Sequence, residues 1–163
     1  MSRGFGRGSP RGGTGSAMFY LWHSKHESAS ADGRRKGEAL SANYSPSLDV
    51  GNRNPLAVIK SFTKADAGKV INGGPLTLEL HDTVFRNDDG IEKTAMLVRE
   101  YIRRGGHQLQ INAVNRDILL KAQKSPDEYR NLIVRVWGWS GYFIELDAEY
   151  QNHIIKRTEY EYV

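Results

Sequence analysis

Residues 132–136 form an apolar run that stops at a glycine flanked by two tryptophans, in the order Trp137-Gly138-Trp139. The β-branched side chains at positions 133, 134 and 136 favour a short buried strand, because they pack well on a pleated surface and neither Pro nor Gly interrupts them. Gly138 ends the run, since glycine adopts positive φ at no steric cost. The pattern therefore predicts a strand that enters a tight turn, and a plain turn glycine is the simplest interpretation of Gly138.

Strand patterns alternate with helix patterns in the rest of the chain. Residues 76–80 alternate leucine with Thr77 and Glu79, the period of a half-buried strand, and residues 108–114 alternate in the same way. A helix also separates residues 108–114 from the strand before Gly138, and two strands separated by a helix make a βαβ unit, whose pairing is normally parallel and right-handed. The sequence therefore predicts an α/β fold.

Capping residues mark the helices between these strands. Asn54-Pro55 opens a short helix, Asn115 caps another that runs to Gln123, and the last helix starts at Asp147. Ser125 begins a capping box for one further turn.

The longest predicted helix follows Asp88 or Asp89 as its cap, runs to Arg104 and ends at two glycines. Its buried face is predicted from helical spacing to consist of Ile91, Ala95, Val98 and Ile102.

The chain of 163 residues contains no Cys. This excludes disulfides, thiolate metal sites and a Cys nucleophile or thiyl radical within it. It also excludes a cysteine-ligated iron–sulfur cluster within the chain. We expect a cytoplasmic protein, because no apolar run is long enough to span a membrane and no signal peptide is evident.

The first 17 residues are rich in Gly and Arg and predict a flexible leader, with a single domain over residues 18–163. The net charge of +4 comes from residues 1–40, and the rest of the chain is neutral. The Arg-Gly pairs of the leader could bind single-stranded nucleic acid through charge and stacking, which is one alternative function.

Three groups of polar residues are candidates for functional sites. His23 and His26 have the spacing of metal ligands on one helix face, but no third ligand is evident, so we predict no metal site. His81-Asp82 follows a strand without a nearby nucleophile and is interpreted as structural. Arg34 or Arg35 could pair bidentately with a substrate carboxylate, or could instead bind loop carbonyls or face water.

The segment from residue 131 reads Asn-Leu-Ile-Val-Arg-Val-Trp-Gly-Trp-Ser-Gly-Tyr-Phe-Ile-Glu-Leu-Asp, followed by Gln151 and Ile154-Ile155-Lys156-Arg157. It resembles the C-terminal signature of the glycyl radical enzymes, which is Arg-Val, a variable residue, Gly, an aromatic residue, then Phe and Leu. Upstream, Asp32-Gly33-Arg34, Gly37-Glu38 and Ser45-Pro46 resemble further landmarks of the family. The resemblance runs from about residue 30 to 160.

Within that family, the Trp-Gly-Trp form looks most like the large subunits of the benzylsuccinate and alkylsuccinate synthases, which add toluene or alkanes to fumarate. Pyruvate formate-lyase and the diol and choline lyases usually have a small residue before the Gly and Tyr after it, and this chain departs from both. A formate acetyltransferase-like reaction or another glycyl radical lyase reaction remains an alternative.

The resemblance implies that the chain is the C-terminal part of a ten-stranded α/β barrel. In that barrel a radical glycine at a loop tip takes a hydrogen atom from a catalytic Cys on a second loop, and the thiyl radical attacks the substrate. The Cys is expected on the rest of a longer enzyme, of which this chain would be the C-terminal part. Alternatively, the Cys lies on a larger partner subunit, and this chain is a small spare-part subunit that docks on it and supplies the glycyl radical. No cofactor is expected in the chain, because a separate iron–sulfur activase that uses S-adenosylmethionine installs the radical. The chain alone is therefore expected to be inactive.

The resemblance makes Gly138 the radical residue. A radical at a glycine Cα is stabilised by delocalisation onto the adjacent amide nitrogen and carbonyl, which requires a nearly planar centre, and a side chain would crowd that plane. Supporting roles in the radical loop are predicted for its neighbours Arg135, Trp137, Trp139, Ser140 and Phe143. The aromatic side chains, with that of Tyr142, could shield the radical from water and dioxygen, or could simply belong to the core. The residues that bind substrate remain unknown.

Overall fold

The structure is a computed structural model, and it describes residue 13 and residues 18–47, 54–70, 72–136, 138–157 and 159–160. The predicted leader, residues 1–17, lies outside this part of the chain except for Gly13. None of the helices within the described ranges is both long and apolar enough to cross a membrane.

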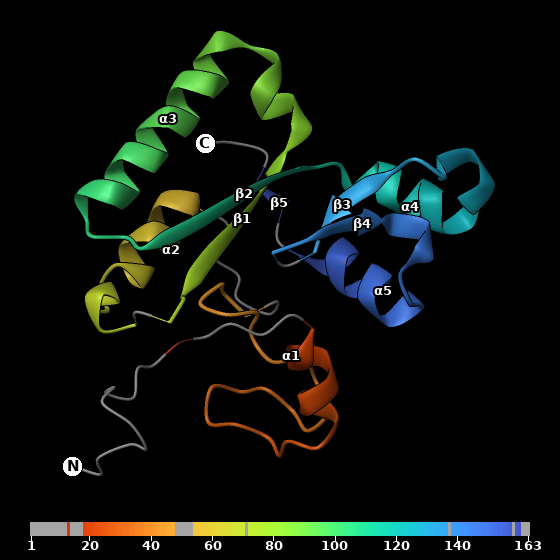
Figure 1. The fold of residues 1–163 in the computed structure, drawn as a ribbon, viewed down its shortest axis with the longest axis horizontal. Coiled ribbons are helices and arrows are strands. Elements are labelled where there is room, and N and C mark those ends of the chain that lie inside the picture. The colour runs from red at the N-terminus through yellow and green to blue at the C-terminus, as the bar shows by residue number, and fades with distance from the viewer. Residues whose placement is uncertain are drawn as a thin grey trace.

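A parallel sheet of three strands in the order β2-β1-β5 forms one half of the molecule (Figure 1). The central strand β1 (Pro75–His81) pairs along its whole length with β2 (Gln108–Val114), and β5 (Glu159–Tyr160) pairs with its last part. Helix α3 (Asp88–Arg103) connects β1 to β2, and these two parallel strands form a βαβ unit with it. The prediction of an α/β fold is confirmed.

The sheet packs on α3 and on α2 (Pro55–Phe62), whose predicted cap Asn54 accepts hydrogen bonds from Leu56 and Ala57. We call the buried apolar cluster of this half the sheet core, and it consists of Val58, Ile59, Leu76, Leu78, Leu80, Val84, Leu97 and Tyr101. The prediction that β1 is half-buried is wrong, since Thr77 and Glu79 on its other face are buried too. A central parallel strand is covered on both faces, which its alternating sequence does not reveal.

The predicted buried face of α3 is also wrong. Ile91 and Ile102 are 50% and 66% exposed, whereas Thr94, Leu97 and Tyr101 face the sheet. The hydroxyl of Tyr101 donates to the carbonyl of Gln108 at 2.8 Å and accepts from the amide of the same residue at 3.1 Å. The contact of Tyr101 with the start of β2 therefore helps to orient the helix, together with the packing of its apolar side chains. Asn87 caps it, in place of Asp88 or Asp89.

The second half of the molecule is built around an antiparallel hairpin of β3 (Ile133–Arg135) and β4 (Ser140–Tyr142). The predicted parallel pairing of the strand before Gly138 with the strand of residues 108–114 is wrong, because the strand that leads to Gly138 pairs antiparallel within this hairpin and does not join the parallel sheet. Helix α4 (Arg116–Lys124) with its predicted cap Asn115, helix α5 (Ala148–Lys156) and the short α1 (Phe19–Trp22) pack around it. The hairpin core consists of Tyr20, Leu21, Ala42, Leu119, Ala122, Val134, Val136, Phe143, Ile154 and Ile155.

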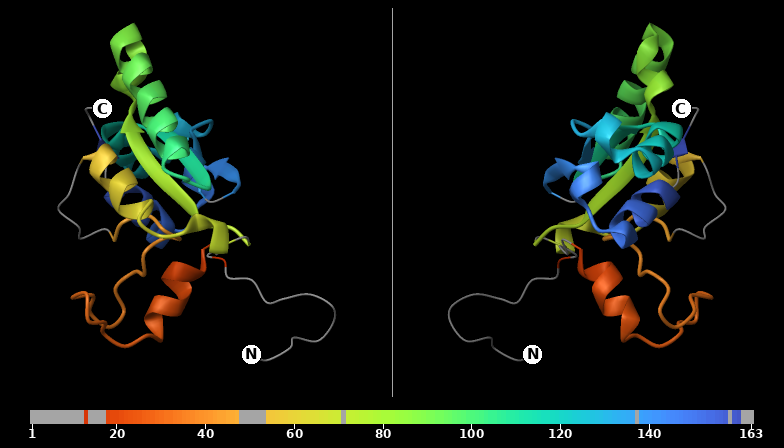
Figure 2. Two further views of the ribbon diagram at one scale, coloured as in Figure 1. Left: turned by 90° about the vertical axis from the view of Figure 1, so that its left-hand side faces the viewer. Right: turned by 90° about the vertical axis from the view of Figure 1, so that its right-hand side faces the viewer.

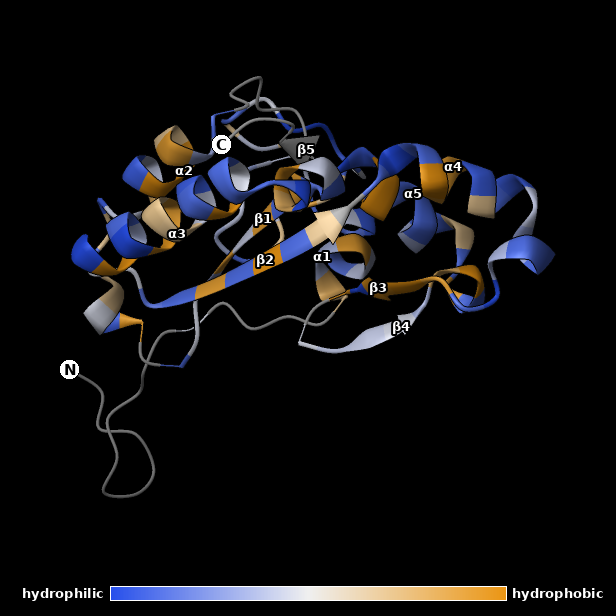
Figure 3. Ribbon diagram, turned by 90° about the horizontal axis from the view of Figure 1, so that it is seen from above, coloured by the Kyte–Doolittle hydropathy of each residue, from blue (hydrophilic) through white to orange (hydrophobic). Residues whose placement is uncertain are grey.

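The figures show how these halves are arranged. Helices α3 and α1 lie at opposite ends of the molecule (Figure 2). The hairpin lies beside α4 and α5, with the largely apolar β3 contrasting with the paler β4 (Figure 3). Short 3-10 turns complete the described chain at His23–Lys25, Ala67–Lys69, Asp82–Arg86, Pro126–Tyr129 and Phe143–Glu145. The turn at Pro126 forms where it was predicted, although the side chain of Ser125 makes no capping hydrogen bond.

Candidate functional site

Gly138 lies at the exposed tip of the β3–β4 hairpin with a φ of +68°. Below the tip, the amide of Val136 donates to the carbonyl of Trp139 at 3.0 Å, and Arg135 pairs with Ser140 across the strands. A positive φ is a conformation that glycine reaches without the penalty that a Cβ imposes. The predicted strand and tight turn are thus confirmed, and the turn projects the glycine outward. The prediction that the strand is buried is wrong, because only Val134 of its three residues is buried and Ile133 is 59% exposed.

The space around Gly138 is open. Leaving aside its two neighbours in the chain, no atom of the described residues lies within 4 Å of the position that a Cβ would occupy on it. At Gly141, by contrast, a Cβ would stand 2.7 Å from the ring of Trp139. A side chain at position 141 would therefore have to displace the ring of Trp139, whereas at position 138 only the backbone conformation favours glycine.

The aromatic residues near the tip have different surroundings. The ring of Trp139 lies over Gly141, Tyr142 is exposed, and Phe143 is fully buried in the hairpin core. Neither Tyr142 nor Phe143 comes within 4 Å of the Cβ position on Gly138, so these two side chains do not cover it. Trp137, predicted to support the loop, lies outside the described residues.

Polar contacts fix the base and the stem of the hairpin. Phe143 donates its amide to the carbonyl of Leu132 at 2.8 Å, and the side-chain amide of Gln151 donates to the carbonyls of Phe143 and Leu146. Higher in the stem, the guanidinium of Arg135 donates to the hydroxyl of Ser140 at 3.2 Å. The structure thus brings Arg135, Ser140 and Phe143 together in the stem below Gly138.

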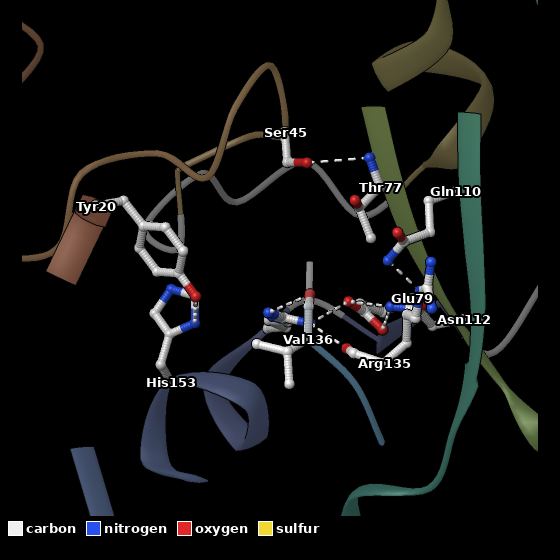
Figure 4. A network of polar contacts seen from close by, with 10 residues as sticks. Tyr20, Ser45, Thr77, Glu79, Gln110, Asn112, Arg135, Val136 and His153 are labelled. Carbon is white, nitrogen blue, oxygen red and sulfur yellow. Dashed lines mark hydrogen bonds and ion pairs between the residues drawn. The ribbon is translucent and has the colours of Figure 1, made fainter. Parts of the chain in front are cut away.

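A buried polar network connects this hairpin to the parallel sheet (Figure 4). The carboxylate of Glu79 on β1 accepts from Asn112 on β2, with both distances 3.0 Å, and from Arg157 beyond the end of α5, also at 3.0 Å. Arg157 donates further to the carbonyls of Arg135 and Val136. Sequence analysis missed this network. The sequence pattern that could have indicated it is a carboxylate, Glu79, and an amide, Asn112, at corresponding positions of two predicted strands.

A groove of about 500 Å³ runs beside the hairpin stem. It is bounded by Gln110 and Asn112 of β2, by the first turn of α4 and by residues 132–135 with Ser140 of the hairpin. This volume lies in the range of small-molecule sites. The groove is lined by the stem and not by the glycine itself.

The upstream landmarks have structural roles. Arg34 is buried and donates to the carbonyls of Ser28, Arg35 and Glu38, so its guanidinium is engaged with loop carbonyls. The hydroxyl of Ser45 accepts from the amide of Thr77 at 3.0 Å, on a part of β1 that β5 does not reach. Arg34 therefore closes its own loop, and Ser45 attaches a second loop to β1.

His153 on α5 is a buried histidine that packs against Tyr20. Burial in the hairpin core, and to a lesser degree the positive charges of Arg157 and Lys156, lower its pKa from 6.5 to about 3. The ring is therefore neutral near pH 7 and lies 3.3 Å from the hydroxyl of Tyr20. His23, His26 and His81 belong to no group of three or more metal-ligating side chains within the described residues.

Comparisons with known proteins agree with the motif at Gly138. Residues 40–144, more than half of the chain, match the glycine radical family. Trans-4-hydroxy-L-proline dehydratase of Clostridioides difficile is 39% identical over 80% of this chain and 16% of its own length. A 4-hydroxyphenylacetate decarboxylase glycyl radical subunit of the same species is 38% identical over 82% of this chain and 15% of its own.

A solved structure, the B12-independent glycerol dehydratase from Clostridium butyricum, superimposes with a TM-score of 0.83 and 36% identity over 88% of this chain and 18% of that protein. The chain thus spans about a sixth of the length of these relatives. They are named as dehydratases and a decarboxylase, and none of them is a fumarate-adding synthase. The chain belongs to the glycyl radical enzyme family.

Proposed function

We propose that Gly138 stores an organic radical on its Cα and exchanges a hydrogen atom with a catalytic Cys. The observation that carries this proposal is the exposed hairpin tip, where the Cα of Gly138 is open to an approaching group while the stem beneath it is fixed. A thiol can reach such a Cα directly. In the exchange, the glycyl radical takes the hydrogen of the thiol, which restores glycine and leaves a thiyl radical.

The Cys must lie on another segment or another chain, because this sequence contains none. We infer two partners: a Cys-bearing portion of the enzyme and a separate iron–sulfur activase that uses S-adenosylmethionine to install the radical. The relative named as a glycyl radical subunit supports a division of labour in which the glycine-bearing chain assembles with other parts.

For the reaction, we propose a lyase that removes water or carbon dioxide from a small polar substrate. The support is that the similar enzymes described above are named as dehydratases and a decarboxylase. The addition of a hydrocarbon to fumarate is a second candidate, favoured by the Trp137-Gly138-Trp139 sequence alone. Acetyl transfer of the formate acetyltransferase kind has no such support here.

Product analysis separates these reactions. The activated, Cys-complemented protein is offered glycerol, trans-4-hydroxyproline and 4-hydroxyphenylacetate in one set, and toluene with fumarate in another. We expect loss of water or carbon dioxide from a member of the first set. Formation of benzylsuccinate without any such loss would overturn the lyase proposal.

The radical site itself is tested with a matched pair of glycines. Gly105 has a φ of +78°, is exposed and, like Gly138, has open space where a Cβ would stand. After anaerobic activation, wild type and Gly105→Ala should give the doublet of a glycyl radical in electron paramagnetic resonance, and Gly138→Ala should give none. Air should then cleave the wild-type backbone at Gly138. A doublet and cleavage that persist in Gly138→Ala would mean that the radical resides elsewhere.

A further inference from the structure

Arg157 lies where the two halves of the molecule meet. Its guanidinium contacts Glu79 of the central strand at 3.0 Å, and the side chains of this ion pair are 9% and 6% exposed. Asn112 donates to both oxygens of the same carboxylate and in turn accepts from Gln110 at 3.1 Å. The carboxylate is therefore held from the sheet side by an amide and from the hairpin side by a guanidinium.

The same guanidinium binds the upper end of the hairpin stem. Nη1 donates to the carbonyl of Arg135 at 3.3 Å and Nη2 to the carbonyl of Val136 at 3.4 Å. The second of these carbonyls stands only two residues before Gly138. An arginine fork can reach a carboxylate and two carbonyls at once, because its N–H donors lie in one plane with fixed directions.

Polar contacts hold the hairpin at two places, at its base and near its tip. Its base is tied through the amide of Phe143 and the side chain of Gln151, as described above. Near the tip, the strands are only three residues long, and Arg135 and Ser140 are exposed. A stem this short depends on contacts from outside to fix the direction of its tip.

We propose that Arg157 is a positioning residue that clamps the hairpin to Glu79 and Asn112 and thereby fixes where Gly138 stands. This inference rests on the proposed function of Gly138. Hydrogen-atom transfer requires the donor and acceptor to meet at short range, and a displacement of about 1 Å costs roughly 100-fold in rate. A purely stabilising role would not call for this ion pair, since replacing a buried pair by apolar residues is often neutral in stability.

The test variant is Arg157→Lys, which keeps a positive charge beside Glu79 but loses the planar fork. Arg34→Lys is the control, because Arg34 is also a buried arginine bound to backbone carbonyls but belongs to the loop of residues 28–38. The first readout is amide hydrogen exchange in the non-activated protein. We expect exchange at Val136 to rise on the order of tenfold or more in Arg157→Lys and to remain unchanged in Arg34→Lys.

The second readout is turnover per radical in the activated assembly with the Cys-bearing portion. We expect the number of spins per chain to remain close to that of wild type in Arg157→Lys, while turnover per spin falls roughly 10- to 100-fold. In Arg34→Lys turnover per spin should match wild type. Turnover per spin within twofold of wild type in Arg157→Lys, or an equal loss in both variants, would overturn the proposal.

The two proposals fail in distinguishable ways. If Gly138 does not carry the radical, Gly138→Ala retains the doublet whatever Arg157 does. If Arg157 does not position the hairpin, Gly138→Ala abolishes the doublet, but exchange at Val136 is the same in Arg157→Lys as in wild type.

Discussion

Gly90 in the sheet half and Gly138 in the hairpin half are glycines for different reasons. A Cβ on Gly90 would stand 2.0 Å from the carbonyl oxygen of Val84, so the start of α3 cannot accept a side chain there without moving the backbone. At Gly138 the described surroundings are open, and only the positive φ of +68° favours glycine there. Packing therefore requires a glycine at position 90, whereas packing does not require one at position 138. A residue that must present a bare Cα to another molecule belongs in the second kind of place.

The cores of the two halves are built from different kinds of elements. The sheet core is formed by a central strand that pairs along its whole length with β2 and packs on helices α2 and α3, whereas the hairpin core is formed by helices gathered around two three-residue strands. The two clusters share no buried residue, and the ion pair of Glu79 with Arg157 joins them. The sheet half therefore supports the hairpin half, which carries the position of the proposed radical.

The largest expected effect tests whether the two cores are separate. Phe143→Ala removes a fully buried ring from the hairpin core, and a loss of about 3 to 5 kcal/mol in the free energy of unfolding is expected. Leu78→Ala in the sheet core is the counterpart, with a loss of about 2 to 5 kcal/mol. Amide hydrogen exchange should show the loss for Phe143→Ala at β3 and α5 while β1 stays protected. Equal loss of protection in both halves would mean that they unfold as one unit.

Local features of the fold were predictable because they depend on residues close in sequence. The caps Asn54 and Asn115, the strand of residues 108–114 and the turn at Gly138 each follow from a capping side chain, a period of two or a glycine. The comparison with known proteins then confirmed the family that the motif around Gly138 had indicated.

Features that depend on distant residues were not predictable. Helix α3 carries apolar residues on two faces, and the contact between Tyr101 and Gln108 decides which one is buried. Glu79 looked like the solvent side of a half-buried strand, because its partner Arg157 stands 78 residues away. The polar network that supports the candidate site therefore became visible only in the folded chain.

An intermediate effect is expected from pH and should appear in the hairpin half first. His153 is protonated in the unfolded chain below its ordinary pKa of 6.5 but in the folded chain only near 3. Between these values the unfolded chain binds a proton that the folded chain does not, so stability is full above pH 6.5 and falls as the pH is lowered. About 2 kcal/mol should be lost by pH 5.

The sheet half responds at lower pH. Hydrogen bonds from Arg103 and Arg104 lower the pKa of Glu100 from 4.5 to about 2, so its stabilising contribution is present above 4.5 and is lost below. Glu100 titrates below pH 4.5, so the loss of stability between pH 7 and 5 belongs to His153. Denaturant unfolding of the wild type should show this loss between pH 7 and 5, and His153→Gln, whose side chain cannot titrate, should not show it. The same decline in that variant would show that another group is responsible.

The smallest effect on stability is expected at the position with the largest proposed effect on function. Gly138→Ala and Gly105→Ala each place a Cβ in open space on a backbone with positive φ, so each should cost only about 1 to 2 kcal/mol of folding free energy, with little difference between them. Asn tolerates this conformation better than Ala does, and Gly138→Asn should therefore cost less. Equilibrium unfolding of the three variants measures these costs. If Gly138→Ala were destabilised by several kcal/mol more than Gly105→Ala, packing at the tip would explain the glycine and the contrast with Gly90 would disappear. If the two costs agree while only Gly138→Ala lacks the radical, the glycine at the tip is required by chemistry and not by folding.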